Sequence, residues 1–367
     1  MGLKVTAHVL RDLKEHKPMG ADEYRRTVAD PDLFRNRIAF TTLLKHPDDG
    51  LLHCGLTAFD TDILYTFDPK TSSFACLGFP EVSERFEVKI HRSLCLDRDG
   101  TIYGGTAGLH DISLRAEGQG GRIFSYRPPE NKIEFLGIPC PRDYIQTITL
   151  DSERRFVYGF TYPVFKFFKF DLNTGEATDF DYIGSITHIS ALDDKGRLWG
   201  TWHPRKHHLF NYDPTEDRIH WFDFGIPGTE AGANRMYPGA GPVDCMINGG
   251  DGFIYIGTTE GTLVRLDPES VEMEFLGKPF PGFRMPAIEV GADGLIYGCG
   301  GDDNETLLFT YDRDARVFET IGPIHDDDLG QGCFRTHDLC IFDDTTIFVG
   351  ETDHPTRAGY LWECRIA

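Results

Sequence analysis

The chain has 367 residues, of which 40% are hydrophobic and 26% charged, and this composition is typical of a folded globular protein rather than a disordered one. The formal net charge of −21 argues against nucleic acid and anionic membranes as partners, because binding to either needs a basic surface. The sequence contains no long apolar run and no signal peptide, so secretion after removal of a leader and a cytoplasmic location both stay open.

The first predicted element is a strand over Leu3–Leu10, with the sequence LKVTAHVL. Residues Arg11–Phe34 follow it as a predicted linker that is partly helical. After this linker two motifs alternate along the rest of the chain. Internal repetition of this length is typical of propellers and solenoids, so the repeats determine the predicted fold.

The first motif combines an Asp-x-x-Gly turn with an apolar residue, an aromatic residue and a glycine. Its clearest copies are DRDGTIYGGT from Asp97, DDKGRLWGTW from Asp193, GGDGFIYIGTT from Gly249 and GADGLIYGCG from Gly291. Weaker copies are HPDDGLLHCGLT from His46, DSERRFVYGFT from Asp151 and DDTTIFVGET from Asp343. Each copy predicts two strands around a tight turn.

The second motif is an apolar pair, an aromatic residue, Asp, a turn and a strand that ends in Gly. Its copies span Leu64–Gly78, Ile123–Gly137, Phe167–Gly184, Leu209–Gly225, Leu263–Gly277 and Leu308–Gly322, with Arg127 in place of Asp in the second. One copy of each motif makes a four-stranded antiparallel unit of about 45 residues, which is the size of a propeller blade.

The last unit stops after its third strand, so another segment must supply the fourth. Pairing Leu3–Leu10 with Tyr360–Ile366 would close the ring and leave no exposed sheet edge there. The sequence therefore predicts an all-β fold, a seven-bladed β-propeller closed by the N-terminal strand, as a single domain over residues 1–367.

The cysteines and known motifs restrict the chemistry. Because the chain has nine cysteines, at least one thiol is unpaired. Most of the cysteines lie in apolar, strand-like sequence. The sequence contains no CxxC pair, so a zinc ribbon is not expected. No GxSxG, HExxH, EF-hand or Walker motif is present. The acidic run Asp326–Asp328 is interpreted as solvated, with calcium binding as the alternative.

In a propeller, the residues that precede the inner strands and those that follow the second strands meet at one mouth. Histidine, tyrosine and arginine recur at these positions. The candidate catalytic residues are His91, Tyr144, His188, Arg284 and His337, and the candidate substrate-binding residues are Tyr162, His203, Arg205, Arg235 and Tyr237. For His91 and His337 the alternative is strand capping, and for Arg235 and Tyr237 it is a surface loop. The metal ligands stay unknown.

Three units, Gly159–Glu176, Gly200–Pro214 and Val349–Cys364, resemble those of seven-bladed propeller polysaccharide lyases. The resemblance is to enzymes that cleave a rhamnose–glucuronate linkage in arabinogalactan glycans and, more distantly, to oligogalacturonate lyases. It implies a uronic-acid oligosaccharide as partner and β-elimination as the reaction, with no certain cofactor and calcium left open.

A uronate lyase needs a group that neutralises the substrate carboxylate, a base, and an acid for the leaving oxygen. The expected assignment is Arg284 at the carboxylate, Tyr144 and His91 as base and acid, His188 and His337 in support, and Tyr162, His203 and Arg235 on the sugars. Two alternatives remain, a non-enzymatic propeller scaffold and a calcium-dependent propeller lactonase.

Overall fold

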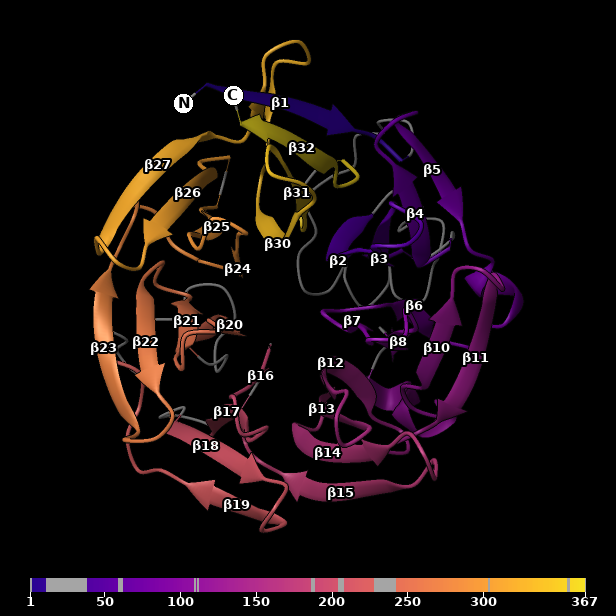
Figure 1. Cartoon of the computed structure of the whole chain (residues 1–367). Helices are drawn as coiled ribbons and strands as arrows, with labels where there is room; N and C mark the ends of the chain where they lie inside the picture. Colours follow the sequence, from indigo (N-terminus) through magenta and orange to yellow (C-terminus); the bar gives the residue numbers. More distant parts are fainter. Residues whose placement is uncertain are drawn as a thin grey trace.

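The computed structural model describes residues 2–10, 38–58, 62–108, 110, 112–185, 189–203, 208–227, 242–302, 304–354 and 357–366. The predicted linker over 11–34 lies outside these residues. Seven sheets stand side by side in a ring, with one strand of each nearest the centre (Figure 1). The predicted fold, a seven-bladed β-propeller, is confirmed.

The blades are numbered in chain order and each runs from its inner to its outer strand. Blade 1 contains β2 (Ala39–Lys45), β3 (Leu52–Thr57), β4 (Leu64–Asp68) and β5 (Ser73–Cys76). Blade 2 contains β7 (Leu94–Leu96), β8 (Ile102–Gly105), β10 (Ile123–Arg127) and β11 (Lys132–Gly137). Blade 3 contains β12 (Tyr144–Asp151), β13 (Phe156–Tyr162), β14 (Lys166–Asp171) and β15 (Ala177–Tyr182). Blade 4 contains β16 (Ala191–Leu192), β17 (Leu198–Trp202), β18 (His208–Asp213) and β19 (Arg218–Trp221).

Blade 5 contains β20 (Val243–Asn248), β21 (Ile254–Thr258), β22 (Leu263–Asp267) and β23 (Glu272–Gly277). Blade 6 contains β24 (Ala287–Val290), β25 (Ile296–Gly300), β26 (Leu307–Asp312) and β27 (Val317–Pro323). Blade 7 contains β30 (Thr336–Ile341), β31 (Thr346–Glu351), β32 (Leu361–Ile366) and β1 (Leu3–His8). Between the blades lie η1 (Phe79–Glu81), β6 (Glu87–Lys89), β9 (Ala107–Gly108), η2 (Ile112–Glu117) and the hairpin β28 (His325–Asp326) and β29 (Gln331–Gly332).

The N-terminal strand closes the ring as predicted. β1 runs antiparallel to β32, with Leu3 opposite Ile366 and His8 opposite Leu361, so the two ends of the chain share one blade (Figure 1). Asp326 was interpreted as part of a solvated run, but it is buried, and its carboxylate accepts a hydrogen bond from the Ala7 N–H at 2.9 Å. This bond ties the outer strand of blade 7 to the β28–β29 hairpin.

The glycine of the first motif is required by packing. An added Cβ on Gly104 would lie 2.1 Å from the ring of Phe124, and one on Gly159 would lie 2.3 Å from the ring of Phe168. The phenylalanine belongs to the second motif of the same blade, so the two motifs recur together because one residue vacates the space that the other fills. This explains the joint abundance of Gly and Phe in the sequence.

The aspartate of the second motif shapes the turn that follows it. The Asp68 carboxylate accepts the N–H of Lys70 at 2.9 Å, and Asp171 accepts the N–H of Asn173 at 2.7 Å. Such bonds to a backbone N–H two residues later fold the chain back on itself and start the outer strand of the blade.

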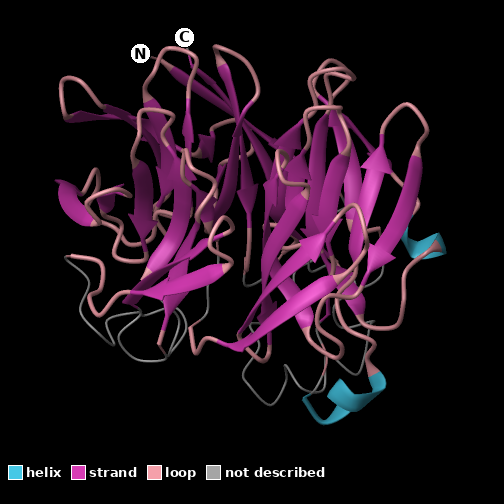
Figure 2. Cartoon of the chain, turned by 60° about the horizontal axis from the view of Figure 1, so that its bottom comes forward, coloured by secondary structure: helices cyan, strands magenta, loops and turns pink. Residues whose placement is uncertain are grey.

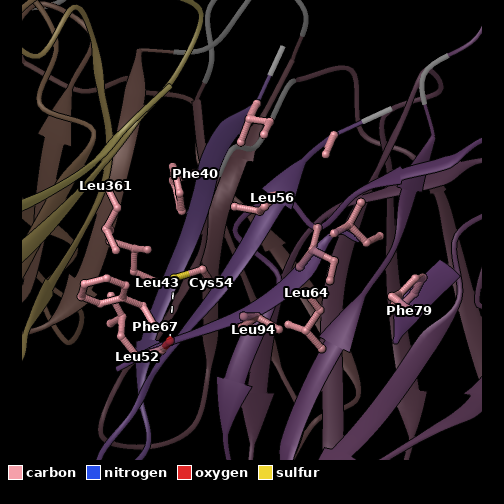
Figure 3. Close-up of a cluster of buried hydrophobic side chains, with 14 of the residues drawn as sticks. Phe40, Leu43, Leu52, Cys54, Leu56, Leu64, Phe67, Phe79, Leu94 and Leu361 are labelled. Atoms are coloured by element: carbon pink, nitrogen blue, oxygen red, sulfur yellow. Dashed lines mark hydrogen bonds between the residues drawn. The ribbon is translucent and has the colours of Figure 1, made fainter. Parts of the chain in front are cut away.

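The hydrophobic core lies between the blades. In one cluster Leu94 of blade 2 and Leu361 of blade 7 pack with the side chains of blade 1, among them Phe40, Leu56 and Phe67 (Figure 3). No blade buries its two faces alone, so each needs its neighbours. The strands cross the ring from one face to the other (Figure 2), and the face at which the inner strands begin is called the mouth face here.

All nine cysteines are free thiols, and seven of them are buried, which agrees with their interpretation as small hydrophobic residues. Within the described ranges, no helix is long and apolar enough to cross a membrane.

Candidate functional site

The inner strands of four blades carry a β-bulge close to the mouth face. The pairing of inner and second strands shifts by one residue at Thr41, Gln146, Asp244 and His337. A bulge re-aims one side chain and interrupts the ladder. These four residues therefore occupy equivalent places around the centre of the ring.

Arg92 connects the inner strands of several blades through hydrogen bonds near the centre of the ring. Its guanidinium donates hydrogen bonds to the carbonyl oxygens of Asp244 at 2.7 Å, Pro286 at 2.8 Å and His337 at 2.9 Å. The three acceptors belong to blades 5, 6 and 7, whereas Arg92 precedes the inner strand of blade 2. The guanidinium therefore lies at the axis of the propeller, and it is 6% exposed.

Arg284 joins the same cluster from blade 6. Its Nη2 and Nε lie 3.1 and 3.2 Å from the two carboxylate oxygens of Asp244, and its Nη1 donates to the Thr336 carbonyl at 3.2 Å. Both partners are almost fully buried. A buried arginine needs such a bidentate partner. Arg284 and Arg92 each have a positive φ, 70° and 46°, which turns the chain just before the inner strand.

His91 and His337 form a pair at the same level. Their Nε2 atoms are 3.0 Å apart, and the Nδ1 of His91 is 2.8 Å from the Gln146 carbonyl. Because a carbonyl only accepts, His91 must carry its proton on Nδ1 and accept at Nε2 from the Nε2–H of His337. The Nδ1 of neutral His337 then carries a lone pair, and this buried atom has no hydrogen-bond partner among the described residues.

The surroundings keep His337 neutral. Burial and the positive charges of Arg92, Lys89 and Arg284, together with His91, hold the pKa of His337 well below its usual value. Its lone pair is therefore available at neutral pH, and an anion bound nearby would raise this pKa again. The arrangement suits a group that takes up a proton only after an anionic substrate binds.

Lys89 is the cation that completes the cluster. It is the last residue of β6 and precedes His91 by two residues, and its positive charge lies close enough to His337 to help lower the pKa of that histidine. Burial lowers the pKa of Lys89 to about 8, with Arg92 contributing and Asp353 opposing. Within the residues that the structure describes, no hydrogen bond or ion pair holds its ammonium group. We refer to Lys89, His91, Arg92, Asp244, Arg284 and His337 as the axial cluster.

Three of the five candidate catalytic residues thus meet at the axis, namely His91, Arg284 and His337. Tyr144 points elsewhere: its ring packs against His110 with centroids 5.1 Å apart, and its hydroxyl is buried with no described hydrogen-bond partner. Burial raises the pKa of Tyr144 to about 12, with Glu87 adding to the effect. His188 lies outside the described residues.

Two of the five candidate substrate-binding residues, Tyr162 and His203, are among the described residues, and neither has a contact with the axial cluster that the structure shows. Tyr162 is opposite Tyr144 in the β12–β13 ladder and is 43% exposed. His203 has a φ of 77° and lies beside Trp202, with ring centroids 5.7 Å apart. Arg205, Arg235 and Tyr237 lie outside the described residues.

Sequence reasoning missed Arg92, Lys89 and the pairing of Asp244 with Arg284. Arg92 follows His91 directly, so the signal was a second basic residue before the same inner strand. The sequence does not show whether the side chain of His91 or that of Arg92 reaches the axis. The positive φ of Arg92 and its contacts with three other blades determine where its side chain lies.

One group of residues in the described ranges has the spacing of metal ligands. Asp213, Glu216 and His220 place their ligand atoms within 4.8 Å of one another. They belong to the turn between β18 and β19, at the face opposite the mouth face, and exposed acidic groups of this kind are common without a metal. No part of the reaction proposed below depends on them.

Deeper along the axis, Glu289 of β24 accepts a hydrogen bond from the Ile341 N–H at 2.7 Å. Burial raises the pKa of Glu289 to about 7, and Asp338 adds to the effect. Between pH 4.5 and 7 the folded protein therefore keeps a proton that the unfolded chain loses, so this group reduces stability as the pH rises through that window.

We expect Glu289→Gln to stabilise the protein at pH 8 by about 1–3 kcal/mol, because Gln accepts the same hydrogen bond without a buried charge. Urea unfolding at pH 8 and pH 4.5 measures this, and the gain should vanish at the lower pH. The matched control is Glu272→Gln on an exposed strand position. An equal gain at both pH values would contradict a raised pKa at Glu289.

The fold and the axial cluster define a β-propeller with polar, titratable groups at its centre. The sequence matches no protein-family model and no curated protein. Among solved structures the fold is common, with 1445 similar chains, so the fold by itself does not specify an activity.

Two of these structures illustrate the range of proteins that share this fold. One is a catalytically inactive His-to-Ala variant of virginiamycin B lyase from Staphylococcus aureus with quinupristin, 14% identical, with a TM-score of 0.64 and full coverage of both chains. The other is the extracellular domain of a one-component system from B. thetaiotaomicron, 15% identical with a TM-score of 0.59, which covers 96% of this chain and 40% of that one. At this identity the similarity shows the propeller fold and nothing finer. It gives no support for a rhamnose–glucuronate lyase in particular.

Proposed function

We propose that the protein is a lyase that cleaves a uronate glycosidic bond by β-elimination, with a rhamnosyl–glucuronate linkage at the end of a glycan as its substrate. The observation that carries the proposal is the pair His91–His337, with a buried lone pair on His337, beside the partly buried ammonium of Lys89. Two features add support: the resemblance of three blade units to those of propeller polysaccharide lyases, and a propeller lyase among the structural neighbours, one that a histidine-to-alanine substitution makes catalytically inactive.

The reaction removes the proton from the carbon next to the uronate carboxylate. The electron pair of that C–H bond forms a carbon–carbon double bond, and the C–O bond one carbon further breaks. The leaving oxygen takes up a proton from the protonated base, so the net reaction moves one proton from carbon to oxygen and the products are an unsaturated uronate and an alcohol. The carbon acid is weak while its carboxylate is charged, so a cation at the carboxylate lowers the barrier.

In this proposal Lys89 binds the carboxylate, and His337 accepts the proton through Nδ1. His91 fixes the tautomer of His337 because its own Nδ1–H is held by the Gln146 carbonyl. Arg284 was expected to bind the carboxylate, but its guanidinium is already engaged with Asp244. It contributes positive potential and fixes the Asp244 side chain.

The net charge of −21 bears on the substrate. A long polyanion would be repelled, whereas a neutral terminal sugar followed by one uronate would not. The proposal is therefore exo-action on an oligosaccharide end.

A specific observation favours a second candidate, a binding propeller without catalysis. His91, Arg92, Arg284 and His337 are each at most 6% exposed, as expected of groups that only hold the blades together. One structural neighbour, the extracellular domain of a one-component system, shows the same fold in a protein that is not described as an enzyme. Turnover of a uronate glycan is the measurement that separates the two candidates.

The test is incubation with gum arabic while the ultraviolet absorbance of unsaturated uronates is followed. We expect His337→Ala and Lys89→Met to lower kcat/KM by about 10²–10⁴-fold, while the exposed control Lys132→Met keeps the wild-type rate. The value of kcat/KM should stay level to well below pH 6.5, because the pKa of His337 is held well below its usual value, and it should fall above about pH 8 as Lys89 loses its charge. Tyr144→Phe tests the alternative acid or base: a similar loss there would move the chemistry to Tyr144. No absorbance change on any uronate glycan would leave the binding propeller as the better explanation.

A further inference from the structure

Exposed aromatic side chains gather at one sector of the mouth face. Five large aromatic residues in the described ranges are exposed, and four of them, Tyr162, Tyr182, Trp221 and Phe224, belong to blades 3 and 4. The exposed large aliphatic residues, Val9, Val82, Val317 and Leu329, all lie in other parts of the chain. Exposed apolar groups that cluster in this way mark binding surfaces.

A ring contact and backbone hydrogen bonds connect the segments that carry these residues. The rings of Tyr162 and Phe165 are 6.1 Å apart, and the Phe165 carbonyl accepts the N–H of Ile183, next to Tyr182, at 2.8 Å. The Ile183 carbonyl in turn accepts the N–H of His203 of blade 4 at 3.0 Å.

The surface continues across blade 4. The ring of Trp202, next to His203, lies 5.0 Å from that of Trp221. We call Tyr162, Phe165, Tyr182, Trp202, His203 and Trp221 the aromatic platform. It spans the mouth-side ends of two neighbouring blades.

Acidic groups border the platform. Asp181 is exposed beside Tyr182, and Asp223 follows Trp221 by two residues and is 93% exposed. Lys166, the cation nearest to Tyr182 in the strand register, is engaged by Asp179 at 2.6 Å. Flat rings with adjacent carboxylates fit a sugar, because rings pack against the C–H face of a pyranose and carboxylates accept hydrogen bonds from its hydroxyls. The negative border disfavours uronates at the platform itself.

We infer that the aromatic platform binds neutral pyranose residues of the glycan whose end enters the axial cluster. The platform reaches toward that cluster, because Tyr162 pairs with Tyr144 at the start of β12, and Gln146 of the same strand contacts His91. The inference rests on the proposed function for the identity of the glycan, but sugar binding at the platform can be measured without turnover.

The test is titration of the whole protein with a neutral β-1,3-galactan hexasaccharide, followed by tryptophan fluorescence and calorimetry. Trp202 and Trp221 lie in the platform, so saturable quenching is expected. Trp221→Ala and Tyr182→Ala should each weaken binding by about tenfold. The matched control is Phe275→Ala, an equally exposed aromatic residue on the outer strand of blade 5, and it should leave the affinity unchanged.

The inference would be overturned by no saturable binding of the hexasaccharide at millimolar concentration, or by the same loss of affinity in Phe275→Ala as in Trp221→Ala. A hexagalacturonate that binds as tightly as the neutral sugar would also contradict it. If the galactan binds as expected while gum arabic yields no unsaturated product, the proposed lyase activity fails and the sugar platform stands.

Discussion

Removal of residues 1–10 is expected to destabilise the propeller by roughly 4 kcal/mol, because blade 7 then loses its outer strand. The deletion breaks six residue pairs between β1 and β32, the contact of His8 with Glu363 at 2.7 Å, and the Ala7–Asp326 bond. It also uncovers the cluster in which Val5 packs with Trp362. The free edge of β32 should cause association that depends on protein concentration.

Guanidinium unfolding and light scattering measure these effects. A synthetic peptide of residues 1–10 added in trans should restore stability, and a scrambled peptide of the same composition is the control. A truncated protein that stays monomeric and loses less than about 1 kcal/mol would show that β1 does not hold the ring closed.

Replacement of Glu351 by leucine is expected to cost about 3–5 kcal/mol. Its two carboxylate oxygens lie 2.7 and 2.9 Å from the guanidinium of Arg357, and they also accept the backbone N–H groups of Phe334 and Tyr360. Glu351 is fully buried and Arg357 is 5% exposed, so the variant would leave an uncompensated charge inside blade 7.

The double variant Glu351→Leu/Arg357→Met should recover much of this loss, because it removes both buried charges together. The exposed pair of Arg85 and Glu117 offers the control, since Glu117→Gln should change stability by less than about 0.5 kcal/mol. A double variant as unstable as the single one would show that the hydrogen bonds to Phe334 and Tyr360, rather than the charge pair, carry the stability.

Glu351 and Tyr144 show why the residues expected to line the mouth differ from those observed there. Glu351 lies at the end of a second strand, where side chains are expected to converge at the mouth, yet it is held inside blade 7 by Arg357. Tyr144 begins an inner strand but turns toward His110, while the backbone carbonyl of Gln146, at the bulge, accepts a hydrogen bond from His91. A bulge shifts the inward direction by one residue, and its position depends on pairing with the next strand.

The architecture can be predicted from the amino-acid sequence, because each blade repeats the same two local motifs. A glycine makes room for a phenylalanine, an aspartate folds the turn, and the missing fourth strand of the last unit identified the N-terminal segment as its partner. The first two signals act within one repeat of about 45 residues, and the third follows from counting the strands of the repeats, so pattern reasoning can find all of them. The contacts of the axial cluster, in contrast, could be found only in the folded ring. Arg92 reaches carbonyls of three blades more than 150 positions away, with Asp244 the nearest in sequence. The pairing of His91 with His337, like that of Asp244 with Arg284, depends on how the closed ring brings distant chain segments to one axis.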